Sequence, residues 1–304
     1  QRQMCIRDSK YSVDLLAAIN GSPTQGFGYT TLMTNNGKMV NRGVEITLSG
    51  EIIRQKDFSW NASLLYAFNR NKVKHISVQP SLWDSRISMP TSYPMVGKPL
   101  YGIYAYKWAG LNENGDPQVY DAENNVTSGP ARDYHALVYC GTTVPIHNAS
   151  LTNVLRYKGF EFSAMLILDA GHKLRSSNIP SINMSNGRIT STAKGIVDRW
   201  TQPGDVTDVP RLLFSNDTEN FNTHRTELYR YSDLFVYDAS NIRLSNISLA
   251  YRVPAHWCKK ISLSGARLQF NVENVATFAF DSKANYDLGG KVKPNYVWGL
   301  YLNF

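Results

Sequence analysis

The end of the chain constrains its fold more than any other segment. Residues 294–304 alternate large apolar side chains with smaller or more polar ones, so the large ones share one face of a strand. These are Tyr296, Trp298, Leu300, Leu302 and Phe304. A soluble protein seldom ends on so apolar an exposed strand, because such an edge invites aggregation. A strand between lipid and a wet lumen has this pattern, which therefore predicts an outer-membrane barrel.

The composition favours strands as the way across a membrane. Charged residues make up 18% of the chain and aromatic residues 12%, including 18 tyrosines, which concentrate where apolar and wet surroundings meet. The longest apolar runs, such as residues 164–168, reach about a third of the roughly 18 residues that a membrane helix requires. Since a closed barrel satisfies its backbone groups internally, we expect alternating strands to span the bilayer.

Charge and cysteine content argue against two other classes of protein. The net charge is +8, but the 32 lysines and arginines are scattered, and no stretch holds five together. A nucleic-acid interface gathers such residues on one face, so we predict no nucleic-acid partner. Cys5, Cys140 and Cys258 form no CxxC pair and have no histidine at metal-ligand spacing, which indicates neither a zinc site nor a disulfide framework.

Alternating segments upstream predict further strands. A hairpin joins residues 40–55 to a strand that begins at Phe58, and a second hairpin, residues 149–173, turns at Lys158 and Gly159. In the segment 241–253 the apolar parity slips between Leu244 and Ile247, which indicates a bulge. Other expected strands are residues 99–111, 241–253 and 260–278, with the remains of one more at residues 11–19. We expect roughly eight to ten strands, against about 22 in a complete plugged transporter.

Long polar segments separate these strands. Residues 75–98, 112–144 and 174–238 are far longer than the roughly 15 residues that a structureless loop usually reaches in a compact domain. Outer-membrane barrels have long extracellular loops and short periplasmic turns, and the short turns of this chain alternate with its long loops. We therefore predict an all-β fold, the C-terminal portion of a large antiparallel transmembrane β-barrel.

Nine motifs follow one another along the chain. They are NRGVE at 41–45, DFSW at 57–60, NRNKV at 69–73, VGKPLYG at 96–102, NGDP at 114–117, RYKGFE at 156–161, DRW with PGD and TDVPR between 198 and 211, DASNIRL at 238–244, and GLYLNF at 299–304. In this order they resemble the C-terminal part of the SusC/RagA family, the TonB-dependent outer-membrane transporters of Bacteroidota. The resemblance covers residues 11–304.

The resemblance implies transport rather than catalysis. The intact protein would import an oligosaccharide or a peptide from a SusD-like lipoprotein, powered by TonB-ExbB-ExbD through a plug that this sequence lacks. It would cross the cell outer membrane many times, in contact with its lipid, and use no cofactor. The resemblance also implies that the terminal strand, with Tyr296, Trp298, Leu300, Leu302 and Phe304, is read by the outer-membrane insertion machinery through strand addition.

The first residues of the chain are unlike the rest. Residues 1–9 have neither an apolar core nor a small-residue cleavage site, so they do not form a signal peptide. They resemble translated sequencing adapter, and we set them aside as non-native. We predict that residues 10–304 are the native part, the last portion of a barrel whose plug and first strands are absent.

Aromatic residues in the predicted extracellular loops are candidates for contact with a substrate or partner. They are Trp83, Tyr134, Trp200 and Phe235. Such rings stack on sugars or pack against a partner lid, and the alternative is that they pack the loops together. In the same loops we expect Asp205, Asp208 and Arg211 to fix the chain by turn and ion-pair contacts.

No catalytic or metal constellation emerges. His172 has no nucleophile motif near it, and we expect a solvated loop histidine. Residues 112–116 lack the spacing and closing glutamate of a calcium loop, which favours a turn. A second hypothesis, from another class, is a secreted or surface carbohydrate-binding β-sandwich with short loops and two packed sheets.

Overall fold

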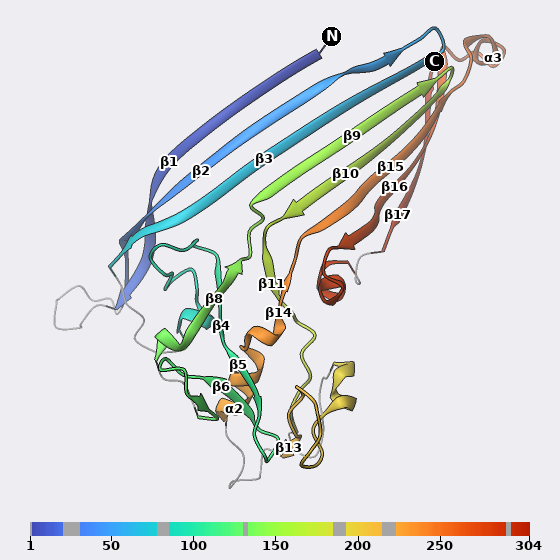
Figure 1. The fold of residues 1–304 in the computed structure, drawn as a ribbon. Coiled ribbons are helices and arrows are strands. Elements are labelled where there is room, and N and C mark those ends of the chain that lie inside the picture. The colour runs from blue at the N-terminus through green and yellow to red at the C-terminus, as the bar shows by residue number, and fades with distance from the viewer. Residues whose placement is uncertain are drawn as a thin grey trace.

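Eight antiparallel strands form one continuous sheet (Figure 1). The computed structural model describes residues 2–20, 31–77, 85–129, 133–184, 193–214, 223–289 and 293–304. Within these ranges, the backbone alone is described for residues 2–20, 31–36, 85, 134 and 223. The strand order is β1-β2-β3-β9-β10-β15-β16-β17. The bounds are β1 Arg2–Asn20, β2 Thr31–Arg54, β3 Phe58–Ile76, β9 His147–Tyr157, β10 Phe160–Ala170, β15 Asn241–Arg252, β16 Gly265–Ala279 and β17 Asn295–Asn303.

One face of this sheet is apolar from β2 to β17. Residues directly opposite each other in neighbouring strands lie on the same face, so the register defines rows of side chains. One row is Trp60, Leu155, Phe162, Leu249, Phe270 and Trp298. A second is Leu48, Leu64, Leu151, Leu166 and Leu244. Side chains in both rows remain exposed, for example Trp298 at 78% and Leu249 at 46%, so protein covers this face little.

The opposite face is polar. Its rows run through Asn61, Val154, Ser163, Ser248 and Asn271, and through Ser49, Ser63 and Thr152. The alternation predicted for the hairpin strands and the terminal strand is therefore confirmed. The described part of the chain contains no helix that is both long and apolar enough to cross a membrane.

The other elements lie largely at one end of the sheet (Figure 1). We call the described parts of residues 85–146 and 171–240 the loop module. Its helices are α1 Ser85–Ser88 and α2 Thr223–Arg230, with 3₁₀ helices at Tyr134–Ala136, Lys194–Asp198 and Asp233–Phe235. Its strands are β4 Gly102–Tyr106, β5 Trp108–Leu111, β6 Pro117–Tyr120, β7 Val126–Thr127, β8 Leu137–Thr142, β11 Lys173–Arg175, β12 Asn183–Met184, β13 Leu213–Phe214 and β14 Val236–Asp238. They form four small sheets, β4-β8, β5-β6-β7, β11-β14 and β12-β13.

The hydrophobic core of the described chain lies in the loop module. One cluster contains Tyr104, Tyr106 and Leu228, and a second contains Ile182 and Tyr229, each at most 1% exposed. The segments predicted as long polar loops are thus partly folded. The expectation of one sheet strand over residues 99–111 is wrong: β4 and β5 belong to two small sheets, because the apolar side chains of β4 are buried on both of its faces.

Short connections close the other end of the sheet. The turn at Lys158 is confirmed, with φ of 54° at that residue, and α3 Ala255–Lys259 lies between β15 and β16. The connection between β16 and β17 lies instead at the end that carries the loop module, and it contains a 3₁₀ helix, Ser282–Ala284, and α4 Asn285–Leu288 (Figure 1). The predicted bulge is confirmed by a register shift between Leu244 and Asn246.

The sheet differs from the sandwich alternative. A sandwich needs two large facing sheets, whereas the described residues form one eight-stranded sheet and four sheets of two or three strands. At its first edge, β1 pairs with β2 and includes residues 2–9, whose predicted adapter origin stays a prediction. The all-β prediction is confirmed.

Candidate functional site

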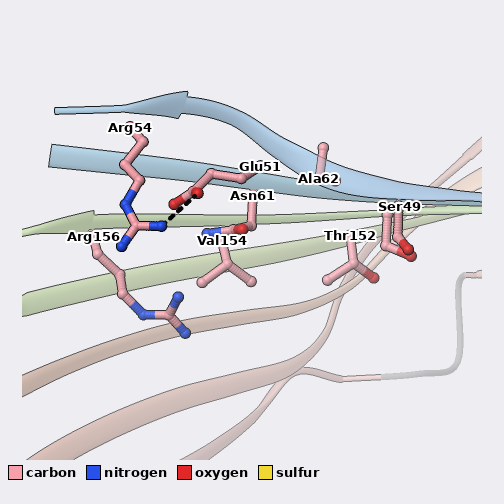
Figure 2. Close-up of a pocket in the computed structure, with 10 residues that line it drawn as sticks. Ser49, Glu51, Arg54, Asn61, Ala62, Thr152, Val154 and Arg156 are labelled. Carbon is pink, nitrogen blue, oxygen red and sulfur yellow. Dashed lines mark hydrogen bonds and ion pairs between the residues drawn. The ribbon is translucent and has the colours of Figure 1, made fainter. Parts of the chain in front are cut away.

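A polar groove lies on the polar face near the turn end of the sheet. It has a volume of about 840 Å³ and lies over β2, β3 and β9. Figure 2 shows that its side chains come from adjacent strands. The lining residues are Ser49, Gly50, Glu51, Arg54, Asn61, Ala62, Ser63, Thr152, Val154 and Arg156.

The groove presents hydroxyl, amide and charged groups. Glu51 accepts a hydrogen bond of 3.4 Å from Arg54, whose side chain is 82% exposed (Figure 2). On the far side, Arg156 donates a 2.7 Å bond to Glu161. Such a surface offers hydrogen bonds to a passing hydrated molecule, and the groove holds no cysteine or histidine and no serine paired with a base. Its geometry suits weak polar contact rather than chemistry.

A buried ion network holds the loop module together. Arg225 on α2 is 2% exposed and donates a 3.1 Å bond to Asp116, which also accepts a 2.8 Å bond from Arg211. Arg225 further donates to the carbonyl of Ile182 and the side chain of Asn183. Burial lowers the pKa of Arg225, while its contact with Asp116 opposes that shift. Every arm of the buried guanidinium is thus satisfied, as a buried charge requires.

The expected turn contact is confirmed for Asp205 and the expected ion pair for Arg211, whereas Asp208 makes a hydrogen bond of another kind. Asn112 accepts bonds from the backbone of Asn114 and Asp116, which makes residues 112–116 a side-chain-stabilised turn. Asp205 accepts from the backbone amide of Thr201, and Asp208 accepts a 2.9 Å bond from the indole of Trp108. These contacts fix the shape of the loops.

The loop aromatics occupy different surroundings. Phe235 is 6% exposed and packs edge-on against Tyr229, with ring centroids 4.9 Å apart, which favours the packing alternative. Trp200 is partly buried over Gly115, whose φ is +74° and where a Cβ would overlap the indole. Tyr134 begins a 3₁₀ helix, but its side chain lies outside what the structure describes, as does all of Trp83. Contact of any of the four with a substrate stays a prediction.

The terminal strand presents the aromatic face that the sequence predicts. Trp298 lies opposite Phe270, with ring centroids 4.2 Å apart, and Leu300 lies opposite Leu268. Tyr296 is 66% exposed, Leu302 41% and Phe304 92%. Only β16 pairs with β17 among the described strands, so one backbone edge of β17 is open. Its role in barrel assembly stays a prediction.

His172 differs from the expectation of a solvated histidine. Its side chain is only 9% exposed. The residue lies in the short connection between β10 and β11. Burial lowers its pKa, which Asp169 and Asp238 partly oppose. The described residues contain no group of three or more side chains arranged to hold a metal ion.

The sequence predicted neither the ion network nor a group of three arginines, Arg156, Arg252 and Arg267, at the turn end of the sheet. Asp116 and Arg225 are 109 positions apart, and no spacing rule links them. A signal does exist for the arginines: Arg156, Arg252 and Arg267 lie at strand ends next to short turns. Interpreting it requires the strand register, which the sequence leaves open.

The chain is similar in sequence and in fold to known proteins. No protein-family model matches the chain. "TonB-dependent receptor P3" of Formosa agariphila is 24% identical over 90% of this chain, and "TonB-dependent receptor SusC" of Bacteroides thetaiotaomicron is 22% identical over 82%. Among solved structures, "Structure of the RagAB peptide transporter" matches 99% of this chain with a TM-score of 0.72 and 21% identity. The chain is SusC/RagA-like.

The match concerns only a part of each relative. The SusC/RagA-like chain spans 28% of the length of the Formosa receptor, 24% of SusC and 33% of the RagAB chain. A second RagAB structure, in the "closed-closed" state, matches 99% of this chain with a TM-score of 0.66. The fold of the eight-stranded sheet with its loop module is therefore a known one, and the matched relatives are named as receptors and transporters rather than enzymes.

Proposed function

We propose that this SusC/RagA-like chain forms part of the wall of an outer-membrane barrel that imports nutrients in a TonB-dependent manner. The observation that carries the proposal is the two-faced sheet. Its apolar rows continue across as many as six strands and remain exposed, while the opposite face carries the polar groove. Lipid on one side and water on the other is the environment in which such a sheet is stable.

The names of the relatives support the direction of the proposal. They are TonB-dependent receptors and a peptide transporter, which supports a peptide as the substrate, with an oligosaccharide as the alternative that the sequence resemblance implies. The loop module, at one end of the sheet, would face a SusD-like lipoprotein outside the cell (Figure 1). TonB-ExbB-ExbD would act through a plug supplied by the remainder of the barrel protein.

The open edge of the last strand supports a second role. We propose that β17 pairs with the outer-membrane insertion machinery before the barrel closes, because an exposed strand edge accepts an added strand. Tyr296, Trp298, Leu300, Leu302 and Phe304 would then place the apolar face of β17 in lipid. Of the two loop aromatics whose side chains are described, Trp200 is the better candidate for contact with a substrate or partner, because it is only partly buried whereas Phe235 is buried.

Depth-dependent quenching tests the placement of the sheet. The full chain is refolded into bilayers that contain brominated lipids, and its tryptophan fluorescence is compared with that of Trp298→Phe. Because Trp298 is 78% exposed on the apolar face, we expect bromine deep in the bilayer to quench it. The matched control is Trp108→Phe in the loop module, which should leave deep quenching unchanged. A water-soluble monomer with no quenching contradicts the proposal.

Copurification tests the partner. The full-length barrel protein that contains this segment is expressed with the lipoprotein encoded beside its gene, and both are extracted in mild detergent. We expect a stable complex that survives removal of the plug but weakens when the loop module is cut by protease. A lipoprotein that remains bound after the loop module is lost would contradict the proposed contact.

A further inference from the structure

Three arginines gather on the polar face at the turn end of β9, β10, β15 and β16. Arg156, Arg252 and Arg267 line one cavity of about 130 Å³ together with Glu161 and Lys158. We call the three arginines and Glu161 the arginine cluster. It adjoins the polar groove through Arg156, which lines both.

The strand register places two of these charges face to face. Arg252 on β15 lies directly opposite Arg267 on β16. Like charges at opposite positions destabilise a sheet, because their side chains are close and share one face. This pair therefore costs stability unless an anion lies between or beside the two guanidinium groups.

Glu161 compensates only part of this charge. It accepts a 2.7 Å bond from Nε of Arg156 and a 3.1 Å bond from Nη2 of Arg267, which crosses β15 above the small side chain of Ala250. Ala250 is 3% exposed beneath this bridge. Three arginines thus share one carboxylate, and the described residues provide no ion pair for Arg252.

One donor in the cluster is left unsatisfied. Nε of Arg267 is buried and has no hydrogen-bond partner among the described residues. An unpaired buried donor is costly, more so when it is charged. A second cavity, of about 400 Å³, opens on the other side of the same two arginines and is lined by Gln269, Tyr301 and Asn303. Space, excess positive charge and an unused N–H group therefore coincide.

We propose that the arginine cluster binds a carboxylate carried by an acidic peptide segment. A guanidinium presents two parallel N–H groups that match the two oxygens of a carboxylate. Glu161 already occupies one such position, so a second monoanion would balance the charge of Arg252 and accept a hydrogen bond from the free Nε of Arg267. A dianionic phosphate would lie beside Glu161 and be repelled more strongly. The site stands on charge and geometry, and it does not depend on the transport proposed above.

Binding of a labelled acidic peptide tests the site. The full chain is folded in detergent micelles and titrated at low salt with fluorescein-labelled hexaglutamate, followed by fluorescence anisotropy. We expect binding that weakens as salt is added, since salt screens exposed charges. Hexaglutamine, with the same length and no charge, should not bind.

Substitutions locate the binding within the cluster. We expect Arg252→Gln and Arg267→Gln each to weaken binding about tenfold, the scale of one charge-assisted hydrogen bond. The matched control is Arg243→Gln, on the same face near the other end of β15, where Arg243 pairs with Asp169 at 3.6 Å. That control should bind hexaglutamate as the unmodified chain does. Arg252→Lys keeps the positive charge but loses the two parallel N–H groups of the guanidinium. Its affinity for hexaglutamate should lie between those of Arg252→Gln and Arg243→Gln.

The melting temperature without peptide gives an independent readout. Because Arg252 faces Arg267, Arg252→Gln should raise the melting temperature of the unliganded chain, whereas Arg243→Gln should lower it by removing an ion pair. Equal binding by the unmodified chain and the Arg252→Gln/Arg267→Gln double variant overturns the proposal. Displacement of the peptide by inorganic phosphate at equal concentration also overturns it, since the site would then prefer phosphate.

Discussion

The sheet and the loop module bury their side chains in opposite ways. Of the buried hydrophobic residues that the structure describes, only Val73 and Ala250 lie in the eight-stranded sheet. The loop module contains most of the others, including Tyr104 and Leu228, in two clusters. The sheet is thus held by its ladder of backbone hydrogen bonds and leaves one apolar face exposed. The loop module has a core of the kind that water-soluble domains have.

Loss of the buried arginine should separate the two regions most clearly. Arg225→Ala leaves Asp116 with one partner instead of two, and breaking a buried ion pair costs about 3–5 kcal/mol. We expect the loop module to open while the sheet persists. Trypsin cleavage within the loop module measures its opening. Heat-modifiable migration of the whole chain in gel electrophoresis shows whether the sheet persists.

A nearby arginine provides the control. Arg230→Ala, at the exposed end of the same helix, should change stability by less than about 0.5 kcal/mol. Equal protease sensitivity of the two variants would show that the ion network does not hold the module.

A charge placed on the apolar face should harm the sheet and spare the loop module. Leu249→Arg puts a guanidinium among Phe162 and Phe270, and because Leu249 lies three residues from the turn end of β15, we expect a cost of about 1–2 kcal/mol, between the interface and midplane values for a barrel in lipid. Its neighbour Ser248 faces the polar side, so Ser248→Arg should cost little. Urea unfolding in bilayers measures the difference, and equal costs would mean that lipid does not cover the apolar face.

A glycine substitution sharpens the packing of the loop module. Gly115→Ala introduces a Cβ at φ of +74° that overlaps the Trp200 ring, and we expect a loss of about 2–3 kcal/mol. Gly204→Ala has φ of +99° but open space around its Cβ, so strain alone should cost about 1 kcal/mol. Thermal unfolding of the two variants, followed by near-ultraviolet dichroism, separates crowding from strain. A cost for Gly204→Ala as large as for Gly115→Ala contradicts the role of Trp200.

Acid should weaken the joint between the two regions slightly. Partial burial of Asp238 opposes its ionisation, but hydrogen bonds from Ser240 and Lys173 outweigh burial and lower its pKa from 3.8 to about 2. Because the folded pKa is depressed, the stabilisation is complete above about pH 4 and is lost as the pH falls through 2. Asp238→Asn should remove this dependence. Melting temperatures between pH 5 and 2 measure it, and identical profiles for both chains would contradict the assignment.

Local periodicity allowed the sheet to be predicted, but not the loop module. From Phe58 onward the alternation defines the apolar side of β3, and the register places Trp60 opposite Leu155 as that side requires. In β4 the run Ile103–Tyr104–Ala105 is buried throughout, so alternation cannot say which sheet the strand joins. A two-sided core and a contact over 109 positions depend on tertiary packing that no short window contains.

The site was predictable to a similar extent. Asp205 makes a local turn contact with Thr201, in a segment rich in turn formers. Asp208 and Arg211 instead contact Trp108 and Asp116, 100 and 95 positions away, which no local pattern indicates. The facing pair Arg252 and Arg267 depends on the register across a connection that contains α3, and a shift of one residue would separate them onto opposite faces.

The bulge in β15 changes which sequence positions face the apolar side of the sheet. Toward the turn, Ile247 and Leu249 lie on the apolar face at odd positions, and beyond Ser245 the same face is taken by Leu244 and Ile242 at even positions. Ser245 is the extra residue at the shift, so removing it would restore strict alternation from Ile242 to Leu249 opposite β10, with both halves of the strand keeping their faces. An alignment of relatives that keeps hydrophobic parity must therefore open a one-residue gap here whenever a relative lacks the bulge.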